Sequence, residues 1–166
     1  MTAREVKLAR SVFHDAIDYA KVRIHKRKWW WFQPRKVTMA PDGHLWFHPK
    51  NQMFCDDFCD RDLGLQGLFI HELVHVWQHQ QGVFLPLRRH PFSRYDYSLK
   101  PGWTLERYGI EQQAEIVRRY KAELANAVDS ASLSLAKNGE GLNEAAAEEF
   151  VKKHVAALSV PVVPTT

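Results

Sequence analysis

The chain has 166 residues, of which 45% are hydrophobic and 25% charged, as expected for one ordinary globular domain. This balance excludes gross disorder, and no apolar run approaches the length needed to cross a bilayer. A net charge of +4 is too small to indicate a nucleic-acid partner, and we do not predict one from the charge. The first residues lack the apolar stretch of a secretory signal, so we expect a cytoplasmic protein, with export by a specialised secretion system as the alternative.

The first half of the chain predicts a helix followed by a small sheet. Thr2 to Glu5 has the spacing of a capping box, and apolar residues then recur at helical spacing, which predicts a helix over residues 3–21. Residues 36–40 and 44–48 flank a Pro-Asp-Gly turn and predict a β-hairpin. Residues 22–25 would add a third short strand.

A second helix is predicted after a connector. Asp60 or Asp62 can cap it, and its apolar positions continue to Gln81, where Gly82 supplies a natural end. Cys55 and Cys59, in the connector, have neither the spacing of a disulfide nor the further ligands of a structural zinc site, so we interpret them as ordinary side chains.

The second half of the chain predicts further helices. Three prolines make residues 83–101 a predicted loop, and helical spacing resumes over residues 104–127. A last amphipathic helix is predicted over 143–158. We therefore predict an α+β fold, with helices packed on a small, mostly antiparallel sheet or hairpin, in one domain over 1–158 with a tail over 159–166.

The sequence His71-Glu72-Leu73-Val74-His75 is the strongest chemical signal. A helix places His71 and His75 on one face, one turn apart, so that both imidazoles can bind one Zn²⁺. Glu72 is rotated by about 100° from His71 around the helix axis, so its carboxylate can act as a general base beside the metal. The alternative is a chance match in a chain with nine histidines, with the pair satisfied by ordinary hydrogen bonds.

A catalytic zinc of this kind needs a third protein ligand. His79 lies a further turn along the same helix, where three ligands in line cannot easily surround a tetrahedral ion. Metzincins carry Gly at position 78 and a histidine at position 81, and this chain has Gln78 and Gln81. That class is excluded.

The motif, followed by Glu111 and Glu115 on a later helix, resembles gluzincins, the thermolysin-like zinc peptidases. The resemblance implies a minimal zincin-like fold in which Glu111 is the third zinc ligand and Glu115 orients His71 or His75. It also implies hydrolysis of a peptide or protein substrate, with Glu72 as the catalytic base. Such peptidases use a further group to stabilise the transition state, for which we consider the following residues: Tyr95, Tyr97, Tyr108 and His90.

Residues 3–120 also resemble small bacterial Vgr-related proteins, some of them associated with type VI secretion, through the stretches 65–70 and 110–117. This resemblance implies a second hypothesis, a non-catalytic adaptor of a secretion apparatus that keeps the metal for stability.

The stretch over residues 23–36 combines seven basic or histidine side chains with a Trp-Trp-Trp-Phe sequence. The simpler interpretation is a solvated basic surface with some aromatics in the core. The alternative is docking to an anionic membrane surface, to a partner such as a secretion apparatus, or to nucleic acid.

Overall fold

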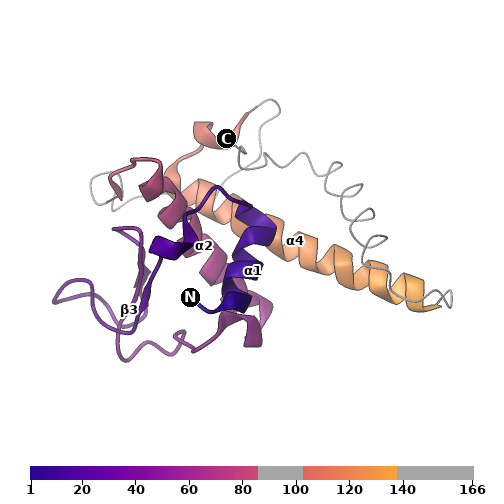
Figure 1. Cartoon of the computed structure of the whole chain (residues 1–166), viewed down its shortest axis with the longest axis horizontal. Helices are drawn as coiled ribbons and strands as arrows, with labels where there is room; N and C mark the ends of the chain where they lie inside the picture. Colours follow the sequence, from indigo (N-terminus) through magenta and orange to yellow (C-terminus); the bar gives the residue numbers. More distant parts are fainter. Residues whose placement is uncertain (86–102, 138–166) are drawn as a thin grey trace.

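The computed structural model of the protein describes residues 1–85 and 103–137 (Figure 1). Within them lie three helices and a small three-stranded sheet, which contacts helix α2 through its central strand. The helices are α1 (Ala3–Phe13), α2 (Leu63–Gln80) and α4 (Ile110–Lys137). The α+β prediction is confirmed. No helix in the described part of the chain is both long and apolar enough to cross a membrane.

The sheet has the order β1-β3-β2 and consists of β1 (Ile24–His25), β2 (Thr38–Met39) and β3 (Leu45–Phe47). Strands β2 and β3 form the predicted hairpin, whereas β1 pairs with β3 in parallel, so the sheet is mixed rather than mostly antiparallel. The segment between β1 and β2 reverses the chain, which lets β3 insert between them. All three β3 residues are buried, as befits a central strand.

Helix α1 is shorter than predicted. Its capping box is present, but the helix ends at Phe13, and His14 adopts a positive φ of 49°. The hydroxyl of Tyr19 donates to the carbonyl of His14 at 2.7 Å and holds the turn. The chain continues past the helix as an irregular segment that includes the 3₁₀ turn η1 (Tyr19–Lys21). This segment still buries Ile17 and Val22 in the core, which explains why the apolar spacing in the sequence extends beyond the helix. The prediction for residues 14–21 was therefore wrong.

Helix α2 is the centre of the molecule. Of the two predicted caps, Asp62 is the one that caps the helix, where its side chain accepts a hydrogen bond from the backbone N–H of Leu65. Every residue from Phe69 to Gln78 is buried. The helix contacts β3, the 3₁₀ turn η2 (Phe58–Asp60) and, most extensively, α4. A burial this complete means that any polar side chain on this stretch must find a partner within the fold.

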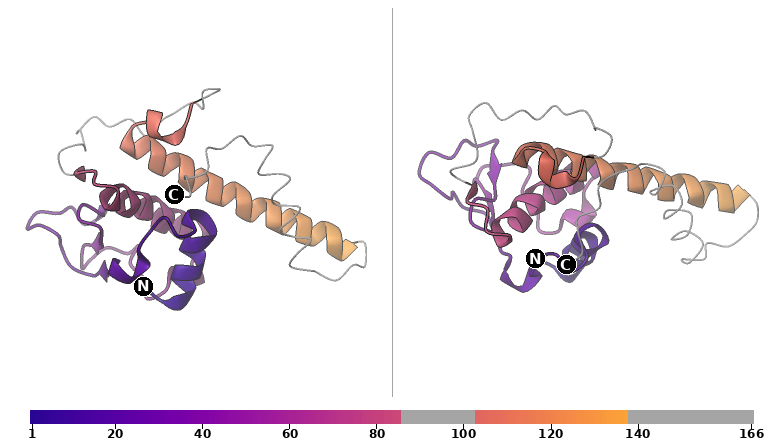
Figure 2. Two further views of the ribbon diagram at one scale, coloured as in Figure 1. Left: turned by 45° about the horizontal axis from the view of Figure 1, so that its top comes forward. Right: turned by 90° about the horizontal axis from the view of Figure 1, so that it is seen from above.

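Helix α4 runs alongside α2 and extends beyond it (Figure 2). It begins later than the predicted residue 104, because a 3₁₀ turn, η3 (Leu105–Arg107), precedes it, and it also ends later than the predicted residue 127. Arg118 on α4 lies close over Gly67 on α2, where an added Cβ would come within 3.2 Å of its Cγ. The absence of a side chain at Gly67 thus permits the close approach of the two helices.

Several predictions fall outside the described residues. They are the helix over 143–158, the tail over 159–166 and three of the proposed transition-state groups, Tyr95, Tyr97 and His90. The limits of the domain therefore remain a prediction.

Candidate metal centre

Helices α2 and α4 bring three potential metal ligands together. His71 and His75 project from adjacent turns of α2, and Glu111 comes from the first turn of α4. The Nε2 atoms of the two histidines lie 3.5 and 3.3 Å from the same carboxylate oxygen of Glu111, Oε2. The three side chains are 8%, 3% and 1% exposed, respectively. Over residues 1–85 and 103–137, this is the one group of His, Cys, Asp and Glu side chains placed to share a metal ion.

The donor set fits a divalent ion such as Zn²⁺. The two imidazole rings are 5.1 Å apart at 79° to each other, so they converge from different directions. Nε2 of His75 is buried and makes no hydrogen bond of good geometry within the described part of the chain. A buried nitrogen without such a bond is costly unless a cation satisfies it. Two imidazoles and a carboxylate also leave a fourth zinc position open.

A buried glutamine fixes the orientation of the His75 ring. Nδ1 of His75 lies 2.9 Å from Oε1 of Gln78, whose Nε2 donates to the carbonyl of Ile110 and to Oε1 of Gln113. Because the amide nitrogen is engaged elsewhere, the carbonyl oxygen faces the ring, and Nδ1 carries the proton. The lone pair of Nε2 is then directed toward Glu111. Sequence reasoning missed this residue, and its position three after His75 was the available signal.

Glu115 lies beside His71. Its Oε2 is 3.9 Å from Nδ1 of His71, on the opposite side of the ring from Glu111. Arg118 and Arg119 contact the two oxygens of Glu115 at 3.1 and 3.4 Å and hold the carboxylate in place. The resemblance left open which histidine Glu115 would orient, and this geometry indicates His71.

Glu72 contributes a buried carboxylate next to the cluster. It is 3% exposed, and its Oε2 has no hydrogen-bond partner among the described residues. Burial acts most strongly on the His75 imidazole and disfavours its charged form, but the nearby Glu111 and Glu72 carboxylates outweigh it and raise the pKa of His75. Glu72 therefore lies close enough to act electrostatically on this group.

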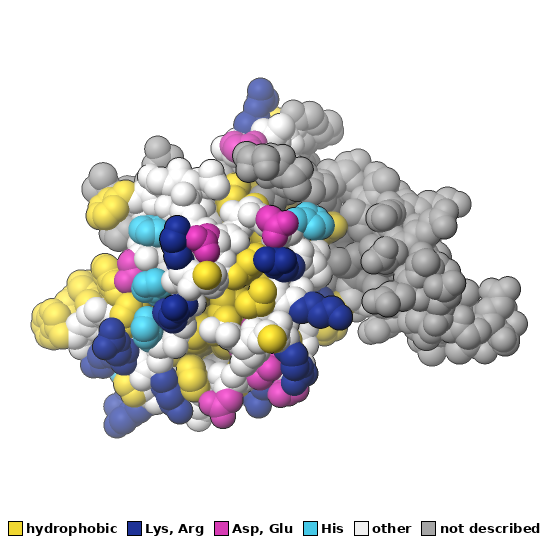
Figure 3. All heavy atoms as spheres, in the orientation of Figure 1, with side chains coloured by type: hydrophobic (Ala, Val, Ile, Leu, Met, Phe, Trp, Pro, Cys, Tyr) yellow, Lys and Arg dark blue, Asp and Glu magenta, His cyan; other side chains and the backbone are white. Residues whose placement is uncertain are grey.

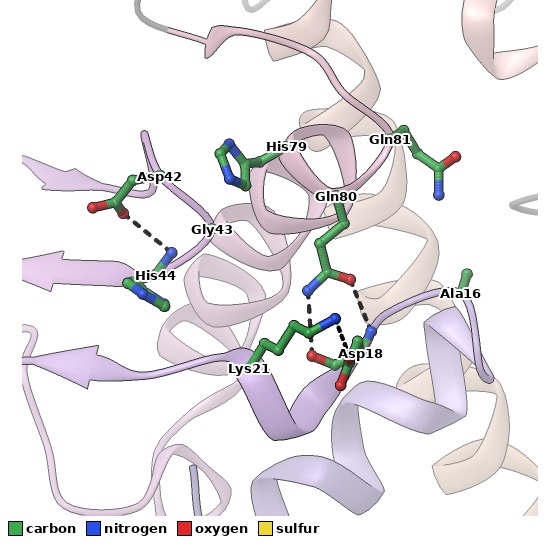
Figure 4. A pocket seen from close by; sticks show the side chains of 9 residues that line it. All are labelled: Ala16, Asp18, Lys21, Asp42, Gly43, His44, His79, Gln80 and Gln81. Carbon is green, nitrogen blue, oxygen red and sulfur yellow. Dashed lines mark hydrogen bonds and ion pairs between the residues drawn. The ribbon is translucent and has the colours of Figure 1, made fainter.

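His79 points away from the cluster. It packs over the hairpin turn, where a Cβ on Gly43 would lie 2.7 Å from its ring. It lines a pocket of about 530 Å³ together with Asp18 and Gln80, which are joined by hydrogen bonds (Figure 4). None of the three potential ligands lines this pocket. His79 is thus not part of the group formed by His71, His75 and Glu111.

Tyr108 is the one proposed transition-state group that the structure describes. Its ring is buried in the core and packs against Trp103 at 5.2 Å. Its backbone carbonyl accepts a hydrogen bond from Nε2 of Gln113, the residue that contacts Gln78. Through its backbone carbonyl, Tyr108 thus helps to hold Gln113 in contact with Gln78.

No family model matches this chain. The solved effector domain of Pseudomonas aeruginosa VgrG2b is similar to it, with a TM-score of 0.69 and 40% identity, over 82% of this chain and 80% of that domain. The chain belongs to the VgrG2b effector-domain family. The type VI secretion system spike protein VgrG2b of Pseudomonas aeruginosa is 42% identical over 127 residues, which is 72% of this chain. This chain spans 12% of the length of that protein. The resemblance to Vgr-related proteins is confirmed.

Proposed function

We propose that this chain is a type VI secretion effector domain that hydrolyses peptide bonds at a zinc centre. The family relationship supports the secretion-linked part of the proposal. The observation that carries the catalytic part is the convergence of His71, His75 and Glu111 in a buried site beside the unpartnered carboxylate oxygen of Glu72. An ion held only for stability would not require that carboxylate.

Three residues would hold the ion, namely His71, His75 and Glu111. When bound, Zn²⁺ would supply Lewis-acid polarisation of the scissile carbonyl and would lower the pKa of water to about 7. Gln78 and Glu115 would keep the two imidazole rings in their binding orientation.

Glu72 would move the proton. Its carboxylate accepts a proton from the attacking water and then donates it to the nitrogen of the departing amine. Its carboxylate is buried beside the candidate ligands, and its Oε2, which has no hydrogen-bond partner among the described residues, is available to accept the proton. The substrate would be a protein or the peptide crosslinks of a cell wall.

A second candidate function is a non-catalytic, metal-stabilised adaptor of a type VI secretion apparatus. The names of the relatives support the secretion setting of this hypothesis and say nothing of peptide hydrolysis. Both functions predict bound zinc, so metal content does not separate them. Both also fit export by the secretion apparatus.

The substitution Glu72→Gln tests the catalytic proposal. We expect it to abolish hydrolysis of a quenched-fluorescence peptide library while leaving about one zinc bound per chain, because Gln cannot accept the proton and Glu72 is not a ligand. The matched control is Glu106→Gln, an exposed acidic residue on η3, which should retain activity. A wild-type chain that binds zinc and cleaves no member of the library, nor peptidoglycan peptides, would favour the adaptor.

A further inference from the structure

A cluster of aromatic side chains protrudes from the loop over residues 26–36, which we call the aromatic loop. Trp31 is 80% exposed and Phe32 51%, and Trp29 and Trp30 are 38% and 41% exposed. These four consecutive residues make up most of the large hydrophobic side chains that are exposed in the described part of the chain. Single exposed aromatics are common on protein surfaces, whereas a contiguous group indicates a binding surface.

The loop is built to present this cluster. Gln33 is 3% exposed, and its Oε1 accepts from the backbone N–H of Trp29 at 2.9 Å. Its Nε2 donates to the carbonyls of Val37 and Trp46, the latter on β3. A buried amide thus ties both arms of the loop to the central strand of the sheet. The aromatic tip is held outward by this anchor.

The aromatic side chains pack on one another rather than against the core. The rings of Trp30 and Phe32 are 3.9 Å apart, and those of Trp31 and Phe32 are 4.5 Å apart in an edge-to-face arrangement. Lys28 donates from Nζ to the backbone carbonyl of Trp31 at 2.8 Å, which fixes the tip of the loop. The result is a preformed apolar surface with a cation beside it.

Positive charge surrounds the cluster. The stretch from residue 19 to residue 41 contains seven lysines and arginines and no acidic residue, although the whole chain has a net charge of only +4. Lys26 and Arg27 lie over the rings of Phe54 and Trp46, at 4.8 and 4.9 Å. Figure 3 shows Lys and Arg side chains beside a hydrophobic group at one edge of the molecule.

We propose that the aromatic loop docks this protein on the surface of an anionic phospholipid bilayer. Tryptophan is enriched at the level of the lipid headgroups, where its apolar ring is buried and its N–H stays hydrated. Lysines and arginines at the same level are attracted to anionic headgroups. The loop supplies both in one rigid unit. This inference stands on residues 26–36 alone and does not depend on the metal centre.

Single-stranded nucleic acid is the competing occupant, because bases stack on exposed aromatic rings and phosphates bind cations. Each stacked base needs a free aromatic face, whereas the rings of Trp30, Trp31 and Phe32 pack on one another. The rings of Trp30 and Trp31 both pack on Phe32, and the buried Gln33 amide anchors the loop to the sheet, so the loop presents one continuous apolar surface, which favours the bilayer.

Binding to lipid vesicles tests the proposal with the full chain. Sedimentation is measured with vesicles of phosphatidylcholine alone and with vesicles that contain phosphatidylglycerol as well. We expect binding to the anionic vesicles that weakens with salt, and a loss of at least about tenfold for either Trp31→Ala/Phe32→Ala or Lys26→Gln/Arg27→Gln/Lys28→Gln.

Matched variants away from the loop serve as controls. Leu63→Ala/Phe84→Ala removes two exposed apolar side chains, and Lys7→Gln/Arg10→Gln/Arg61→Gln removes three exposed charges. Both should bind as the wild type does, and circular dichroism checks that every variant is folded. The proposal is overturned by equal binding to both kinds of vesicle, by no binding to either, or by control variants that lose as much as the loop variants. Tighter binding to a single-stranded oligonucleotide than to anionic vesicles would also overturn it.

Discussion

Nδ1 of His75 lies 2.9 Å from Oε1 of Gln78, and Nε2 on the other side of the ring faces the carboxylate of Glu111. The contact is buried, and Gln78 is itself held by the carbonyl of Ile110 and the side chain of Gln113. Residues of both α2 and α4 therefore fix the orientation of the His75 ring.

Substitution of Gln78 by Ala should weaken zinc binding. The His75 ring would lose the acceptor that holds its Nδ1 proton, and loss of such a contact typically costs about 10–100-fold in metal affinity. Competition with a chromophoric chelator measures the affinity, and circular dichroism shows whether the variant is folded. Gln66→Ala removes a glutamine near the start of α2 whose Nε2 donates to the carbonyl of Arg61; this variant is the control and should bind zinc normally. An unchanged affinity in folded Gln78→Ala would show that the contact does not matter.

Removal of the metal should lower the stability of the protein. An ion that binds only the folded state stabilises it by about 2.7 kcal/mol when its free concentration is a hundred times the Kd. We expect a lower melting temperature in the presence of a chelator, and restoration by added zinc. His71→Ala and Glu111→Ala should abolish this zinc-dependent shift. His79→Ala should keep it, because His79 lies in a separate pocket. A shift that disappears only in His79→Ala would refute the ligand assignment.

The helices that hold the site could be predicted because their signals are local. The cap at Asp62 and the periodic apolar residues identified α2 nearly to its last residue, and the same periodicity placed His71 and His75 on one face. The beginning of α1 was marked by its capping box. Its end was not, because His14 turns the chain without a Gly or Pro to signal it.

The remaining features depend on contacts between distant segments. The role of Gln78 follows from the position of Ile110 and Gln113, and nothing local to α2 shows where α4 begins. The parallel pairing of β1 depends likewise on how the loop after it returns to the sheet. Glu111 was inferred from a resemblance to a family, since paired glutamates on a helix usually face solvent.

The thiol of Cys59 should react slowly with alkylating reagents. Burial and a contact with Asp57 raise its pKa to about 11, and burial also raises the pKa of Cys55. At pH 8 the thiolate fraction of Cys59 would be roughly a hundredfold below that of a free cysteine, and the rate roughly tenfold lower after allowing for its greater nucleophilicity. The rate should keep rising with pH beyond 9, where that of a free thiol levels off. Asp57→Asn should speed the reaction at pH 8; a denatured sample gives the rate of the unprotected thiols. Equal rates in folded and denatured protein would contradict the prediction.

Glu5 joins α1 to the segment before α2. Its carboxylate is 1% exposed, and it accepts from the backbone N–H of Thr2 at 2.8 Å and from that of Phe58 at 3.1 Å. Hydrogen bonds to a charged group contribute about 1.5–3 kcal/mol each, so Glu5→Ala should lower the free energy of unfolding by about 3 kcal/mol. Urea denaturation measures the change. Lys7→Ala, an exposed residue on the same helix, should change stability by less than about 0.5 kcal/mol. Glu5→Gln keeps an acceptor but not the charge and should lie between the two, and a Glu5→Ala variant as stable as the wild type would show that this bridge does not hold α1 in place.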